Sequence, residues 1–322
     1  ARQWLSYADY QALTDGATTE QAWMDGLAEN NLYSGPDMSY AQTRMSDQEA
    51  LIGVALVDVA QAATWGFPPE HTVLLQGVFN PLAITAVYAL RDFSANPVGE
   101  LTMFCGPDGC DSGYTTHLDG RNPGDPFGGE LGRQQPVLFV PLNGQSQLVS
   151  SPDLPTLEAS AAAVNGETPS LAEAPDYQAA VHTLTDTSTL LQAYFLGPDT
   201  FSEPAEAGEL PAFSLAVLAE TETDGGRGAS ITLIYPSLAD AEAAAPALEE
   251  RMETLTPGRS NQPFAAVLKE RGVLFSTRTT EDGETGLGVI QLVFEPLEGE
   301  GTAYPLLVNS LNRRDLDWLA LP

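Results

Sequence analysis

Apolar residues cluster in short runs between turn residues over the first half of the chain. Residues 73–79, 99–105 and 137–149 combine β-branched and aromatic side chains, which predicts strands. The last run contains Asn143-Gly144, a dipeptide that favours the tight turn of a hairpin. Residues 1–40 show no clean period, and we expect them to form helical turns packed by their aromatic side chains.

Capping residues mark the expected helix starts. Asn80-Pro81 predicts one start, because asparagine accepts hydrogen bonds from the first free amides and proline suits the first helical turn. We expect Leu82, Val87 and Leu90 to form the buried face of this helix. Serine-led capping signals predict three further helices, which begin near Ser46, Ser151 and Ser170, the last one reaching toward Leu191.

A segment rich in proline, glutamate, alanine and glycine, residues 198–211, is the best candidate for a linker. Beyond it the pattern resumes, with turn residues at Asp224-Gly225-Gly226 and Asp282-Gly283. It predicts two hairpins, over residues 213–235 and 273–294, a helix capped by Ser237, and a closing helix over residues 306–321.

This order of elements predicts an α+β fold with two antiparallel sheets, each covered by helices on one face. The length of 322 residues suits two domains, and the linker candidate divides them into residues 1–200 and 201–322. The chain carries enough apolar side chains for a sizeable core, since 43% of its residues are hydrophobic.

The charge is strongly negative, with 44 acidic residues against 13 basic ones and a net charge of -31. This field repels phosphate backbones and anionic lipid headgroups, so we expect neither nucleic-acid binding nor membrane-surface binding. No apolar run is long enough for a membrane-spanning helix. The sequence starts at Ala1 without a leader, as expected if a leader or an upstream lipid anchor has been removed.

The two cysteines, Cys105 and Cys110, flank the turn sequence Gly-Pro-Asp-Gly. Proline and glycine favour a reversal that brings the two sulfur atoms within bonding distance, so the spacing predicts a disulfide. A disulfide indicates an oxidising, extracytoplasmic compartment: the periplasm, the cell surface or the medium. Metal binding is the alternative, and His117 would be the nearest additional ligand.

Several short motifs resemble those of a family. The run from Gln147 to Leu154, then Asn165-Gly166, Ser170-Leu171-Ala172 and Pro175-Asp176-Tyr177, resembles an uncharacterised bacterial extracytoplasmic, lipoprotein-like family. The resemblance covers residues 54–191, and its motifs are structural. It implies a lipoprotein-like or secreted location and an α+β fold, and it supplies no catalytic residues.

Residue types that perform catalysis near neutral pH are scarce. The chain has three histidines, His71, His117 and His182, and one lysine, Lys269. No metalloprotease, nucleophile-elbow, phosphate-loop or dinucleotide-binding motif occurs. The acidic group around Asp282 is expected to be a solvated hairpin tip. We therefore predict no catalytic centre, although a triad of residues distant in sequence stays open.

One oxygen-rich segment could bind calcium. Asp119, Asn122, Asp125 and Glu130 offer the carboxylate and amide oxygens that calcium prefers, in a glycine-rich loop. The spacing differs from an EF-hand, and Arg121 lies within the loop. An ordered surface loop without a cofactor is the alternative, and the one we expect.

The leading functional hypothesis is a non-catalytic extracytoplasmic protein that binds a protein partner or forms part of an envelope or extracellular assembly. A secreted hydrolase with a dispersed active site is one alternative. A carrier that binds a small molecule or a metal between two domains is another.

Overall fold

The computed structural model describes residues 4–30, 45–66, 70–201, 210–256, 261–297 and 302–321, with the backbone alone for residues 45–47. The chain divides into two compact units, Ser6–Ser170 and Leu171–Pro322, and Ala1–Leu5 belongs to the second unit. The predicted domain boundary at residue 200 differs from this division. Most of the linker candidate, residues 202–209, lies outside the described part of the chain.

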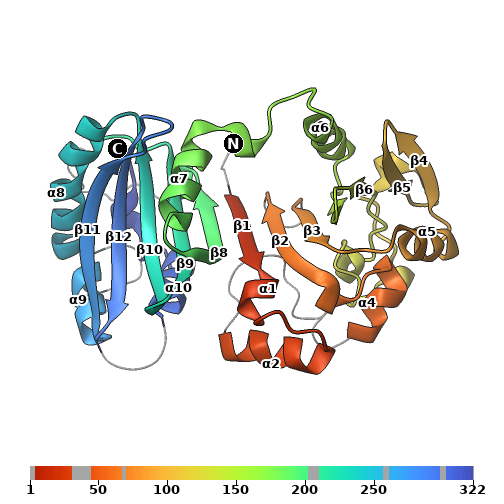
Figure 1. The fold of residues 1–322 in the computed structure, drawn as a ribbon, viewed down its shortest axis with the longest axis horizontal. Helices are drawn as coiled ribbons and strands as arrows, with labels where there is room; N and C mark the ends of the chain where they lie inside the picture. The colour runs from red at the N-terminus through yellow and green to blue at the C-terminus, as the bar shows by residue number, and fades with distance from the viewer. Residues whose placement is uncertain are drawn as a thin grey trace. The chain divides into compact units, whose positions relative to one another are not determined.

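Strands and helices are interspersed along the first unit, and its first strand, β1, begins two residues before the unit does (Figure 1). The strands are β1 (Trp4–Asp9), β2 (Val59–Trp65), β3 (Thr72–Gly77), β4 (Ser94–Val98), β5 (Leu101–Cys105), β6 (Val137–Pro141) and β7 (Ser146–Ser150). The α-helices described are α1 (Tyr10–Leu13), α2 (Glu20–Asn30), α4 (Met45–Ile52), α5 (Pro81–Leu90) and α6 (Leu154–Val164).

The second unit has longer strands. They are β8 (Thr189–Leu196), β9 (Leu215–Thr223), β10 (Gly226–Tyr235), β11 (Val273–Glu281) and β12 (Gly288–Pro296). The α-helices described are α7 (Pro175–Thr185), α8 (Leu238–Thr254), α9 (Phe264–Glu270) and α10 (Tyr304–Asn312), and a 3-10 turn, η7 (Asp317–Leu319), follows them.

The described strands hydrogen-bond in one twelve-stranded sheet, in the order β11-β12-β10-β9-β8-β1-β2-β3-β7-β6-β5-β4. The prediction of two separate sheets is therefore wrong. The pattern did not reveal four of the described strands, β1, β2, β4 and β8, and three of these, β8, β1 and β2, are consecutive in this order. In β1 the small residues Ser6 and Ala8 are buried while Tyr7 is half-buried, which inverts the usual signal of large apolar residues facing inward.

Helices pack on both faces of the sheet within the second unit, which corrects the expectation of one covered face. Tyr177 of α7 stacks on Phe195 of β8, and Phe264 of α9 contacts Phe294 of β12. The strand register places Phe195 on the face of Gln291. Gln291 and Phe294 are an odd number of positions apart along β12, so the two phenylalanines point to opposite faces.

The first unit is covered in the same way. Met103 and Phe104 are neighbours on β5 and therefore point to opposite faces. Met103 belongs to a buried cluster with Leu157 of α6. Phe104 stacks on Tyr88 of α5, with 4.7 Å between the ring centroids. Helices thus cover both faces of β5. Its sequence therefore lacks the alternation of apolar and polar residues that is typical of a half-exposed strand.

Local signals set most of the turns and caps as predicted. Asn80 accepts hydrogen bonds from the amides of Leu82 and Ala83 at the start of α5, and Ser237 caps α8 through the amide of Asp240. Gly144 adopts a positive φ of 80° in the β6–β7 hairpin. These three predictions are confirmed.

Other local predictions are wrong. Leu82 and Leu90 are 79% and 85% exposed, and Ile84 and Tyr88 form the buried face of α5 instead. The helix expected to reach Leu191 ends at Thr185, where β8 soon follows. The closing helix, α10, ends at Asn312 and not at Leu321. In each case an apolar run suited more than one arrangement, and packing with distant residues decided between them.

Candidate functional site

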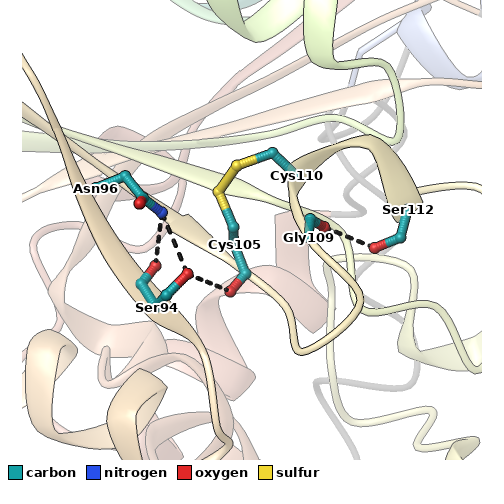
Figure 2. Close-up of a disulfide and its surroundings, with 6 residues drawn as sticks. All are labelled: Ser94, Asn96, Cys105, Gly109, Cys110 and Ser112. Carbon is teal, nitrogen blue, oxygen red and sulfur yellow. Dashed lines mark hydrogen bonds between the residues drawn. A yellow bond between two sulfur atoms is a disulfide. The ribbon is translucent and has the colours of Figure 1, made fainter.

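The predicted disulfide is present. Cys105 at the end of β5 is bonded to Cys110, and their Cα atoms are 4.6 Å apart. The intervening turn closes through a hydrogen bond from the Gly109 amide to the Gly106 carbonyl oxygen, 2.9 Å long. Figure 2 shows the bridge beside Ser94, whose hydroxyl donates to the Cys105 carbonyl oxygen. The bridge thus holds the beginning of the long β5–β6 connection against the sheet.

The oxygen-rich segment proposed to bind calcium lies in this connection. Asp125 is buried, and its carboxylate pairs with the Arg91 guanidinium at 2.6 Å and accepts the Phe127 amide at 2.9 Å. Arg91 also donates to the Leu51 carbonyl oxygen. Asn122 accepts the Gly124 amide in a local turn. An internal ion pair and turn hydrogen bonds therefore order the segment.

The remaining calcium candidates do not join Asp125. Asp119 and Glu130 are exposed. No group of three or more histidine, cysteine, aspartate or glutamate side chains within the described ranges is arranged to hold a metal ion. Calcium binding and a cofactor-free ordered loop both stay predictions for this segment.

His117 and His182 lie in different settings. His117 pairs with the exposed Asp108 at 2.9 Å. His182 of α7 contacts Asp282 at the β11–β12 turn, with 3.2 Å between Nδ1 and Oδ1. The Thr285 hydroxyl donates to the same carboxylate at 2.6 Å. The aspartate thus lies between the histidine and the hydroxyl, whereas a catalytic triad requires the histidine in that position.

Asp282 acts as a structural acceptor. Burial alone would raise its pKa, but the hydrogen bonds from Thr285 and His182 hold the pKa below its ordinary value. An ionised carboxylate that accepts hydrogen bonds from both Thr285 and His182 stabilises the hairpin tip. The predicted solvated tip is therefore wrong for Asp282, which is buried.

A row of amide side chains crosses three adjacent strands of the first unit. Gln147 donates to Gln76, Gln76 donates to Gln61, and Gln61 donates to Asp9, over distances of 2.7, 3.3 and 3.0 Å. Gln61, Gln76 and Gln147 are paired in the strand register. Because the side-chain amides hydrogen-bond to one another, we interpret this row as stabilising the register of the neighbouring strands and not as a binding site.

An open cavity of about 770 Å³ lies in the second unit. It lies between the end of α9, the adjoining ends of β11 and β12, and α10. A volume of this size matches the pockets that hold drug-sized ligands. Its apolar lining consists of Val267, Val273, Pro296, Ala303, Pro305 and Leu306. No histidine occurs among the described residues that line it.

The α9 side of the cavity is held by aromatic packing. Phe264 is buried and stacks on Trp318 of η7, with 5.7 Å between the ring centroids. The helix ends at Glu270 with Arg271 as its C-cap, and Gly272 adopts a positive φ of 65° that lets the chain turn into β11. Arg271 therefore lies at the cavity on a backbone fixed at both sides.

The α10 side is held by a helix-end motif. The Asp315 amide donates to the Ser310 carbonyl oxygen at 2.8 Å, and the Arg314 amide donates to the Leu311 carbonyl oxygen at 3.1 Å. Arg314 has a φ of 61°, so the chain reverses in a Schellman motif. This reversal turns Asp315 back against the helix, where it lines the cavity while only 7% exposed.

The cavity carries a mixed set of charges. Glu270 accepts the side chain of Gln262 at 2.8 Å, and Arg313 contacts one oxygen of Asp315 at 3.3 Å. The other oxygen of Asp315, Oδ1, is buried without a hydrogen-bond partner in the described part of the chain. A buried, unsatisfied carboxylate oxygen is unfavourable unless a donor reaches it. Sequence reasoning did not detect this site, because its residues carry no motif and come from separate segments.

No known protein-family model matches this chain, and no curated protein matches it. Two crystal structures of TP0453 show a distant likeness. Crystal form III aligns with 96% of this chain and 95% of that chain, at 9% identity and a TM-score of 0.38. Crystal form I aligns with 96% and 93%, at 10% identity and a TM-score of 0.34. A likeness this distant carries no argument about this protein.

Proposed function

We propose that this protein is a non-catalytic extracytoplasmic binding protein that holds a polar small molecule in the cavity between α9 and α10. The observation that carries the proposal is the cavity itself, whose lining is mostly polar, includes charged groups of both signs and has six apolar residues beside them. Polar groups that converge on a cavity orient a polar ligand, and apolar contacts add to its binding. The proposal places the site within the second unit, whereas the sequence suggested a cleft between domains.

Two observations support the non-catalytic, extracytoplasmic part of the proposal. The Cys105–Cys110 disulfide suits an oxidising compartment. In the cavity, the described residues offer no histidine or cysteine beside a serine or threonine hydroxyl, the arrangement by which an activated nucleophile is recognised. The resemblance to lipoprotein-like proteins agrees with this location. Among the described helices, none has the length and apolar character of a membrane crossing.

A cavity-blocking variant tests the proposal. Asn309 is exposed on α10 and lines the cavity, so Asn309→Trp should fill it without disturbing the core. Asn312→Trp is the control, because Asn312 is exposed at the end of the same helix and does not line the cavity. A fragment library screened by ligand-observed NMR should give binders that Asn309→Trp abolishes and Asn312→Trp retains. Binders that survive the blocking variant, or none at all, would contradict the proposal.

Partner binding is a second candidate, supported by the surface of α5. Leu82 and Leu90 of this helix are exposed, as is Val78 just before it, and exposed apolar groups of this kind occur at protein interfaces. The test is purification from the source organism with associated proteins. A Leu82→Asp/Leu90→Asp variant should lose a specific co-purifying subunit that the Asn309→Trp variant keeps. Identical co-purification by both variants would exclude this surface.

A further inference from the structure

The charges in the α9–α10 cavity indicate a class of ligand, an inference that rests on the proposed function. We propose that the cavity binds a short zwitterionic peptide, with the ligand's ammonium group on Asp315 and its carboxylate on Arg271. Both residues line the cavity, and they come from its two opposing helical segments. A single molecule that bridges them needs one cationic end and one anionic end.

Asp315 supplies the negative charge. Its side chain is buried and its position is set by the backbone reversal after α10. The side chain lines the cavity; Arg313 contacts Oδ2, whereas Oδ1 is buried without a partner among the described residues. An ammonium group supplies three N–H donors and a positive charge, which is the group that best satisfies a buried carboxylate oxygen.

Arg271 supplies the opposite charge. It is exposed at the C-terminal end of α9, and no ion pair of its guanidinium occurs with any residue described. The chain has 13 basic residues against 44 acidic ones, yet two arginines, Arg271 and Arg313, line this one cavity. A guanidinium binds a carboxylate through two parallel hydrogen bonds, which favours a terminal carboxylate over a neutral amide.

Size and lining favour a peptide over a single amino acid. A cavity of about 770 Å³ accommodates a drug-sized molecule, which corresponds to a few linked residues. Val267 and Leu306 offer apolar contacts for a side chain between the two charged ends. Asn309 lies on α10 where it can hydrogen-bond a peptide group, since its amide both donates and accepts.

The test uses the tripeptide Ala-Leu-Ala in four forms: free, N-acetylated, C-terminally amidated, and blocked at both ends. Isothermal titration calorimetry with the full chain should show binding of the free peptide and at least a tenfold loss of affinity on blocking either end. The Asp315→Asn variant should no longer distinguish the free from the acetylated peptide. The Arg271→Gln variant should no longer distinguish the free from the amidated peptide.

Matched controls are available in the same unit. Asp224→Asn and Arg278→Gln change exposed residues of the same types away from the cavity, and both should keep the wild-type preferences. Circular dichroism of each variant establishes that it is folded. If Asp315→Asn fails to fold, two measurements still test recognition of the ammonium group in this cavity. They are the loss of affinity on N-acetylation of the peptide in the wild-type protein, and the absence of peptide binding in Asn309→Trp.

The outcomes separate the two proposals. Equal affinity for all four peptide forms, abolished by Asn309→Trp, would overturn the zwitterion inference and leave the binding function standing. No binding of any form up to millimolar concentration would also overturn the inference, and the fragment screen would then decide the binding function independently. If Asp315→Asn, Arg271→Gln and Asn309→Trp all distinguish free from blocked peptides as the wild type does, the peptide binds elsewhere. That result would overturn the assignment to this cavity.

Discussion

At the scale of single residues, left-handed backbone conformations mark three helix ends. Asp15, Asp92 and Arg314 have φ values of 51°, 61° and 61°, and each follows a helix. A residue with a β-carbon adopts this conformation less readily than glycine does. The helix-end hydrogen bonds hold these residues in place, including the reversal that brings Asp315 to the cavity.

Replacing Asp92 by glycine should stabilise the protein. Asp92 is exposed and serves as the reversing residue after α5, where its amide donates to the Ala89 carbonyl oxygen. Asp92→Gly should raise the free energy of unfolding by about 1 kcal/mol, measured by urea denaturation, because glycine removes the conformational strain. Asp186→Gly is the control and should lower it, since Asp186 has an ordinary φ of -56°. A loss of stability in Asp92→Gly would contradict the interpretation.

A buried glutamate predicts a pH-dependent loss of stability. Glu220 is 1% exposed on β9, and burial raises its pKa above the ordinary 4.5, although a hydrogen bond from Gln192 acts in the opposite direction. As the pH rises above 4.5, the unfolded chain ionises this group before the folded chain does, so this group lowers stability as the pH rises through the folded pKa. The buried carboxyl therefore destabilises the protein near neutral pH.

Glu220→Gln should remove this effect. The variant should exceed the wild type by roughly 1 kcal/mol in the free energy of unfolding at pH 8, with a smaller difference near pH 5. Glu222→Gln, at an exposed position on the same strand, should show no comparable dependence. Urea denaturation at the two pH values is the measurement. A difference that shrinks with rising pH would show that Glu220 is ionised and well solvated in the fold.

At the scale of elements, two devices hold the long β5–β6 connection: the disulfide at its start and the Arg91–Asp125 ion pair within it. Glycines allow the close packing between them. A β-carbon on Gly129 would lie 2.4 Å from the β-carbon of Asp125, which real side chains do not tolerate. The connection is thus ordered by contacts along its own length.

Removing the bridge should weaken the fold only modestly. The Cys105→Ser/Cys110→Ser variant should lose about 2 kcal/mol of unfolding free energy, because the ring is short and constrains few conformations of the unfolded chain. The expected result is a folded protein with a lower denaturation midpoint by circular dichroism. Failure to fold would show that the bridge organises more than its own turn.

Breaking the ion pair should have a larger effect. Arg91→Gln leaves the Asp125 carboxylate buried without its cation and should lower the free energy of unfolding by roughly 3 kcal/mol. The double variant Arg91→Gln/Asp125→Asn should recover part of the loss, since it leaves no buried charge. Chemical denaturation of the single and double variants measures this coupling. Additive effects of the two changes would refute it.

At the scale of the whole molecule, the net charge of -31 predicts a stability that depends on salt. Acidic residues repel one another most in the compact state, and salt screens this repulsion. The Tm measured by calorimetry should rise by several degrees between ~0.01 M and ~0.5 M sodium chloride. The exposed pair Glu249 and Glu250 on α8 offers a check, because their replacement by glutamine should reduce the salt dependence. A falling Tm would show that attractive ion pairs dominate.

Sequence by itself determined the features that depend on a few adjacent residues. The cap at Asn80, the turn at Asn143-Gly144 and the Cys105–Cys110 bridge follow from side-chain geometry within a short segment, so they could be predicted. Tertiary structure decided the rest. Which face of the apolar helix α5 is buried, and the joining of β8, β1 and β2 into one sheet, depend on partners distant in sequence. Arg271 and Asp315 likewise line one cavity although they are distant in sequence, and no local sequence pattern predicts this.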